Sequence, residues 1–140
     1  MNKKKNRIII IMLILVLLIL GFVIASFIKS TLGYGEERIV KELTSMGEEI
    51  YNDYYYPSIS SEKSEEDISN FLKAYERIGL KFNLNELEKY NSNFKEKISK
   101  FKNNNKQCNK DDTMVVIYPK SPYGKTDYTL EIKLECGFKN

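Results

Sequence analysis

The stretch 128–135 reads Tyr-Thr-Leu-Glu-Ile-Lys-Leu-Glu, and it decides how the folded part of this chain is built. Apolar and polar residues alternate along it, which predicts a β-strand with one buried and one solvated face. A second run, Thr-Met-Val-Val-Ile-Tyr at 113–118, is apolar on both faces, as expected of a more interior strand. The turn-rich segment 119–125 connects the two runs, so we expect an antiparallel β-hairpin.

Upstream of the hairpin, apolar residues recur at spacings of three and four, which is typical of amphipathic helices. This pattern predicts helices over 36–56, from Ser64 to Gly79, and over 85–103. Pro57 is expected to end the first helix. The Asn-Ser-Asn at 91–93 leaves open whether the third region is one helix or two. Helices followed by a hairpin predict the α+β fold class.

Residues 8–28 (IIIIMLILVLLILGFVIASFI) contain no charged residue. A helix of this length measures about 30 Å, the thickness of the hydrocarbon core of a bilayer. Cationic residues are concentrated before it, at 1–7, and such flanks stay cytoplasmic. We therefore expect a single-pass transmembrane helix in the cell membrane, with the lipid bilayer as a partner, a cytoplasmic N-terminus and the C-terminal domain outside. A cleaved signal peptide is the alternative, although its apolar region is usually shorter.

This topology divides the chain, whose length allows one modest domain plus an appendage. The expected parts are a cytoplasmic basic tail at 1–7, a transmembrane helix at 8–28, a joint and juxtamembrane helix at 29–57, and an extracytoplasmic α+β domain at 58–140.

The two cysteines of the chain fit one register of the hairpin. If the tip lies near Pro122, Val116 faces Tyr128 and, further from the tip, Cys108 faces Cys136. Because thiols oxidise outside the cell, we expect a Cys108–Cys136 disulfide that closes the domain. Closing a loop of about 29 residues stabilises a fold by about 3–4 kcal/mol in the chain-entropy model.

The composition limits the chemistry that the chain can perform. It has 140 residues, no His and two Cys, which excludes a Ser-His-Asp triad, a Cys-His dyad, an imidazole metal site and a four-thiolate zinc site. The carboxylates fall mostly on predicted polar helix faces, and no motif brings two of them together. We therefore expect no catalytic, cofactor-binding or metal-binding residues, no cofactor, and a protein that is not an enzyme.

Two features of the sequence are candidates for a partner surface. One is the tyrosine cluster before Pro57, since tyrosines provide rigid, amphipathic contact area; the other is the lysine-rich segment 89–110. Core packing and a solvated helix face are the alternative explanations. The candidate residues are Tyr51, Tyr55, Tyr56, Lys95, Lys97 and Lys102. An envelope protein or an anionic wall polymer is the expected partner, whereas nucleic acid is not expected outside the cell.

The layout of the chain resembles that of type IV pilins and pseudopilins: an N-terminal apolar helix, a helical continuation, and a β-part closed by a C-terminal disulfide. Inside the apolar run, the families' leader pattern of Gly followed by Phe occurs only at Gly21-Phe22, and Ser26 stands where those families have Glu. We expect a membrane-anchored envelope protein that acts by binding or assembly. A pilin-like subunit of a filament or secretion machine, and an anchored cell-wall-acting hydrolase or binding module, are the alternatives.

Overall fold

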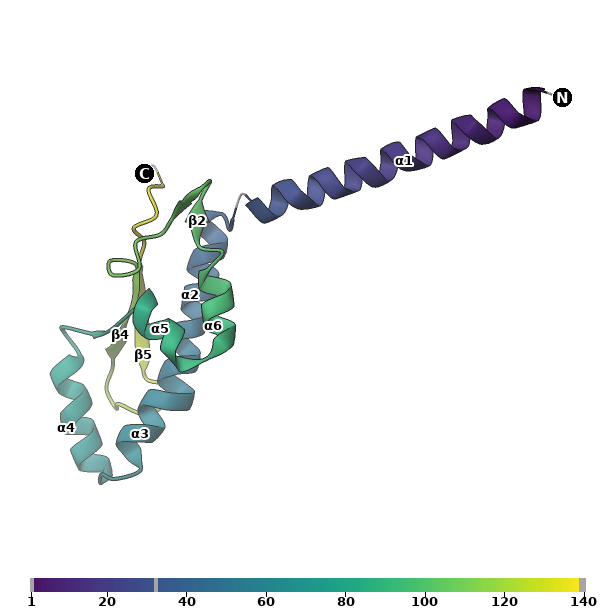
Figure 1. Ribbon diagram of the computed structural model, residues 1–140. Coiled ribbons are helices and arrows are strands. Elements are labelled where there is room, and N and C mark those ends of the chain that lie inside the picture. Colours follow the sequence, from purple (N-terminus) through teal and green to yellow (C-terminus); the bar gives the residue numbers. More distant parts are fainter. Residues whose placement is uncertain (1, 32, 139–140) are drawn as a thin grey trace.

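A computed structural model describes the backbone of residues 2–31 and 33–138, and the side chains of 10–25 and 33–138. The first helix, α1 (Asn2–Thr31), extends away from the rest of the chain (Figure 1). Its large apolar side chains from Ile10 to Ile24 are each more than half exposed. The basic residues of the predicted tail at 1–7 have side chains outside the described part.

The prediction of a membrane-spanning helix is contradicted. Where the structure describes the chain, no helix combines the length and the apolar character needed to cross a bilayer. The ends of the predicted 8–28 span lie outside the described side chains. The predicted transmembrane helix and the predicted single-pass location in the cell membrane are therefore wrong.

The fold class is α+β, as predicted. A long helical segment consists of α2 (Glu36–Glu49), the π-helix η1 (Ile50–Tyr55) and α3 (Tyr56–Ser60). It is followed by α4 (Glu65–Tyr75), β1 (Leu80–Asn83), α5 (Leu84–Tyr90) and α6 (Ser92–Ile98). The short strands β2 (Lys102–Asn103) and β3 (Lys106–Gln107) precede β4 (Met114–Pro119) and β5 (Tyr128–Lys133).

Several helix boundaries follow from local capping. Ser64 accepts a hydrogen bond from the Asp67 N–H and begins α4, as the sequence predicts. Asn91 separates α5 from α6 and caps α6 by accepting from the Phe94 N–H, so the predicted third region is two helices. Pro57 does not end the helical segment as predicted, since it lies in the first turn of α3, which follows η1 directly and continues to Ser60.

The main sheet has three antiparallel strands in the order β1-β4-β5. The alternation predicted for β5 is observed, since its even-numbered residues are half-buried and its odd-numbered residues are exposed. α2 packs on the face that carries Val115 and Leu130, and Gly47 makes the contact. A side chain at Gly47 would place Cβ 2.7 Å from a Val115 methyl group, so glycine permits this close approach.

The predicted register of the hairpin is wrong. Val116 pairs with Glu131 rather than with Tyr128, and Ile117 pairs with Leu130. The odd-numbered residues of β4 therefore share the core face with the even-numbered residues of β5. The connection explains the shift, because its tight turns, such as the Tyr123 N–H bonded to the Lys120 carbonyl, move the tip beyond Pro122.

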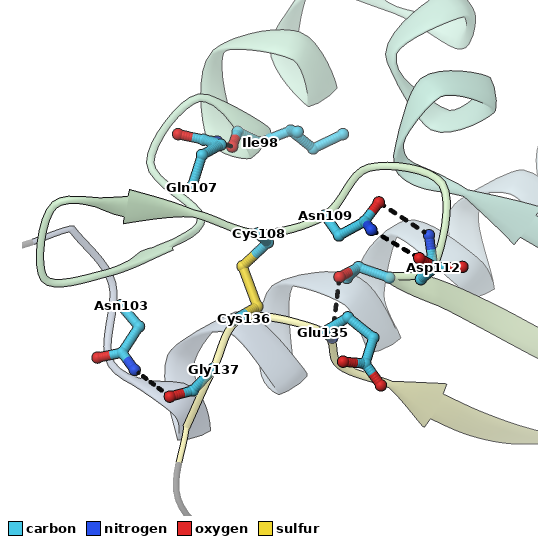
Figure 2. The surroundings of a disulfide bond; sticks show 10 residues. Ile98, Asn103, Gln107, Cys108, Asn109, Asp112, Glu135, Cys136 and Gly137 are labelled. Carbon is cyan, nitrogen blue, oxygen red and sulfur yellow. Dashed lines mark hydrogen bonds between the residues drawn. A yellow bond between two sulfur atoms is a disulfide. The ribbon is translucent and has the colours of Figure 1, made fainter.

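The Cys108–Cys136 disulfide is present, as predicted, although the register that suggested it is not (Figure 2). Both cysteines lie outside the paired strands. The Asn109 N–H donates to the Glu135 carbonyl at 2.8 Å, and the Glu135 N–H donates to the Thr113 hydroxyl at 3.0 Å. These bonds bring the segment after β5 beside the segment before β4, so the two thiols meet.

The core lies between the long helical segment, the sheet and the α5–α6 pair. It contains apolar residues from every one of these elements, and both cysteines belong to it. A smaller cluster joins α4 to the β4–β5 connection, where Tyr123 packs against Ile68 and Leu72. Figure 1 shows α3 and α4 at the end of the folded part that is opposite to β2.

Candidate functional site

The π-helix concentrates the tyrosine side chains. In a π-helix a residue bonds to the fifth residue along the chain, and here the Tyr56 N–H bonds to the Tyr51 carbonyl. Positions 51, 55 and 56 therefore share one side of the helix, and the Tyr51 ring lies 6.2 Å from that of Tyr55 and 6.0 Å from that of Tyr56. π-turns inside α-helices occur frequently at functional sites.

The predicted tyrosines have different surroundings. Tyr51 is fully buried and its ring lies 4.6 Å from that of Tyr128, so its side chain belongs to the core and offers no contact surface. Tyr56 is half-buried and packs against both apolar clusters. Tyr55 is also half-buried, but it lines a surface hollow. Of these three residues, Tyr55 is the one that the structure places in a candidate binding site.

The predicted lysines lie away from the tyrosines. Lys95 and Lys97 are on α6, and Lys97 forms an ion pair with Glu42 at 2.8 Å. Lys102 is on β2, which lies near the beginning of α2 (Figure 1). The tyrosines come directly after the C-terminal end of α2. Two further lysines of the 89–110 segment pair with glutamates, Lys100 with Glu96 and Lys110 with Glu88. The lysine-rich segment is thus partly neutralised and does not join the tyrosines in one surface.

Two hollows adjoin along β1. The first has a volume of about 330 Å³ and is lined by Lys81, Phe82, Glu86, Lys89 and Tyr90. The second has a volume of about 380 Å³ and is lined by Tyr55, Tyr75 and residues 78–82. Because both include Lys81 and Phe82, they form one surface along the strand. We call this surface the β1-edge groove.

Aromatic rings form the floor of the β1-edge groove. The Phe82 ring lies edge-on to Tyr55, at 5.9 Å between centroids, and to Tyr90, at 6.3 Å. Tyr54 packs against Tyr90 at 5.5 Å. Such edge-to-face contacts fix the rings in place. The groove therefore offers a rigid apolar surface rather than one that must be ordered on binding.

The groove also has a particular polar chemistry. Burial raises the pKa of Tyr55 to about 12, and burial followed by the charge of Glu86 raises the pKa of Tyr90. Both phenols are therefore neutral at ordinary pH. The Glu86 carboxylate accepts from the Asn83 N–H at 2.9 Å as part of a capping box, while the Glu86 N–H donates to the Asn83 side chain. This carboxylate holds the start of α5.

Sequence reasoning missed most of this groove. It predicts only the two strands of the hairpin and does not identify β1 as the third strand of the sheet. The alternation of Leu80 and Phe82 directly before the Asn83–Glu86 capping pair is the signal that could have found it. Among the described residues, no group of three or more acidic, Cys or His side chains could hold a metal ion.

Comparisons with protein-family models, with curated proteins and with solved structures found no match to this chain.

Proposed function

We propose that this chain is a binding or assembly module rather than an enzyme, and that the β1-edge groove is its contact surface. The observation that carries the proposal is the position of β1. This strand is one of the two outer strands of the three-stranded sheet, and aromatic hollows lie along it. An open sheet edge beside preformed apolar hollows is the arrangement that peptide-binding domains use.

The chemistry of the groove supports binding more than catalysis. Its lining offers neutral phenols, a buried Phe82 ring, aliphatic side chains and two lysines. Its carboxylate, that of Glu86, is engaged in the capping box. Affinity and orientation are what these groups can supply.

The position of Ile78 adds to the contact surface. Ile78 is 61% exposed and lies at the end of the groove beside Gly79. Gly79 has a positive φ of 71°, and a side chain there would collide with Val116 of β4. This fixed turn presents Ile78 to solvent directly before β1 begins. Ile78 therefore extends the apolar lining at this end of the groove.

A display selection tests the proposal. The full chain is immobilised and used to select from a random peptide library, and enriched peptides are then tested against the Lys81→Pro variant. Proline at this position blocks the open edge, and edge strands tolerate it. We expect enriched peptides to bind the wild-type chain and to lose binding to Lys81→Pro, whose fold is checked by circular dichroism. Peptides that bind both proteins equally would place binding elsewhere and refute the proposal.

A further inference from the structure

We infer that the β1-edge groove takes an extended segment of a partner protein, paired along β1, with large apolar side chains at alternate positions and a carboxylate between them. This inference rests on the proposed function and specifies the partner's chemistry. It has three supports: the backbone groups that β1 leaves on its outer edge, the position of the two hollows, and the charge of the groove.

The backbone support comes from the register of β1 against β4. The Leu84 N–H bonds to the Thr113 carbonyl at 3.1 Å, directly beyond the Asn83–Met114 pair. In an antiparallel pair, bonded and non-bonded residue pairs alternate, so Phe82 bonds inward to Val115 while Lys81 does not bond to Val116. The N–H and carbonyl of Lys81 therefore point to the open edge.

The neighbours of Lys81 on this edge are already engaged. The Asn83 N–H donates to the Glu86 carboxylate, and the Gly79 N–H donates to the Tyr75 carbonyl at 2.9 Å. Lys81 is thus the centre of a short edge whose flanking N–H donors are satisfied. A partner segment can exchange both of its own backbone bonds with Lys81, as one bonded residue pair of an antiparallel ladder. The short length fits a peptide rather than a long added strand.

The side-chain support comes from the two hollows on either side of this point. One hollow is at the beginning of β1 and includes Tyr55 and Tyr75. The other is at the end of β1 and includes Lys89 and Tyr90. Alternate residues of an extended segment are about 7 Å apart and point to the same side. A segment centred on Lys81 therefore directs its two flanking side chains into these hollows. Their aromatic floors favour large apolar side chains.

The lysines of the groove favour a particular side chain at the central position of the partner segment. Lys81 and Lys89 both line the hollows, and neither belongs to an ion pair among the described residues. The nearby carboxylate, that of Glu86, is held by the Asn83 N–H. The partner's central residue pairs with Lys81, so its side chain lies beside the Lys81 side chain. A carboxylate there complements it, whereas a cation would be repelled.

A second copy of this chain fits the groove less well. Its own open strand, β5, also alternates apolar and polar residues, but Leu130 and Ile132 are packed against the core. Those side chains are not free to enter the hollows of a neighbour. The inferred occupant is therefore a flexible segment of another protein, with free apolar side chains.

A set of short synthetic peptides tests the inference with the full chain. The probe is acetyl-Thr-Leu-Glu-Leu-Thr-amide carrying a fluorophore, and fluorescence anisotropy measures its affinity. One control places the two leucines side by side, and a second replaces the glutamate by lysine. Because a surface ion pair contributes up to about 1 kcal/mol, we expect the lysine peptide to bind about fivefold more weakly. We expect the control with adjacent leucines to lose one of its two hollow contacts and to bind more weakly as well.

Reversing the charge at Lys81 and at the central position of the peptide tests the expected ion pair directly. Lys81→Glu is expected to weaken the glutamate peptide and to strengthen the lysine peptide, whereas Lys133→Glu, on the exposed side of β5, is expected to change neither. Affinities that ignore the spacing of the leucines, or that do not follow the charge exchange, overturn the inference. If the display selection nevertheless yields peptides that require an open β1 edge, the proposed function stands without it. Self-association of the chain that Lys81→Pro abolishes would assign the groove to a second copy instead.

Discussion

The close approach of α2 to the sheet makes Gly47→Ala a sharp test of the packing. Alanine favours an α-helix over glycine by about 1 kcal/mol, so at an exposed helical position this change would stabilise the fold. Gly47 is buried, however, and the added Cβ would lie 2.7 Å from a Val115 methyl group and 3.4 Å from Leu130. Overpacking of this kind costs about 1–3 kcal/mol. We therefore expect a net destabilisation of about 1 kcal/mol from these two opposing effects.

The sign of this effect depends on the methyl groups of one residue. In a Val115→Ala background those groups are absent, and the remaining Val115 Cβ is at an ordinary contact distance of 3.5 Å. The same Gly47→Ala change is then expected to stabilise by about 1 kcal/mol, which gives a coupling energy of about 2 kcal/mol in the double-mutant cycle. Urea unfolding followed by circular dichroism measures all four proteins. Ser45→Ala, at an exposed position of α2, is the control for helix propensity. If Gly47→Ala stabilises the wild-type chain as Ser45→Ala does, the described contact between α2 and β4 is wrong.

Three further predictions concern the core and its closure. Replacing both Cys108 and Cys136 by alanine is expected to lower the free energy of unfolding by about 3.5 kcal/mol, from the entropy of an open loop of 28-residue separation, and a loss below about 1 kcal/mol in urea unfolding would contradict it. Leu130→Asp is expected to destabilise by about 2–4 kcal/mol because its side chain packs on the core, whereas Thr129→Asp on the exposed face should leave protease resistance unchanged. Burial holds the pKa of Tyr55 at about 12 in the folded chain, above its ordinary value of 10.0, so its contribution to stability is complete below pH 10 and is lost between pH 10 and 12. Phenolate absorbance during alkaline titration checks this, and a Tyr55→Phe chain whose stability falls equally steeply over that range would contradict it.

The features that local chemistry determines were predictable from the sequence. The Ser64 cap and the two faces of β5 depend on neighbouring residues, whereas the sequence left open the division of the third helical region at Asn91. The hairpin register did not follow from alternation, because the turns inside 119–127 set it, among them the Gly124 N–H bonded to the Asp127 carboxylate. An apolar pattern identifies which residues share a face, but several registers satisfy it.

The candidate site depends on long-range placement, and this explains why the sequence did not reveal it. Tyr55, Phe82 and Tyr90 come from three separate elements and meet only after the core forms. The π-turn that presents Tyr55 places position 56 over Tyr51, whose ring the core buries. Tyrosines at 51, 55 and 56 look equivalent in the sequence, and only tertiary packing divides them into core and surface.

Amide hydrogen exchange at two adjacent residues tests the central claim most directly. The Lys81 N–H faces the open edge of the sheet, whereas the Phe82 N–H faces β4. In the free chain we expect fast exchange at Lys81 and slow exchange at Phe82, measured by nuclear magnetic resonance. Saturation with the glutamate peptide is expected to slow exchange at Lys81 by about tenfold or more, a free energy of about 1.4 kcal/mol, and to leave Phe82 unchanged. A Lys81 amide that is already protected in the free chain, or that a bound peptide leaves unprotected, would contradict the account of β1 as an open docking edge.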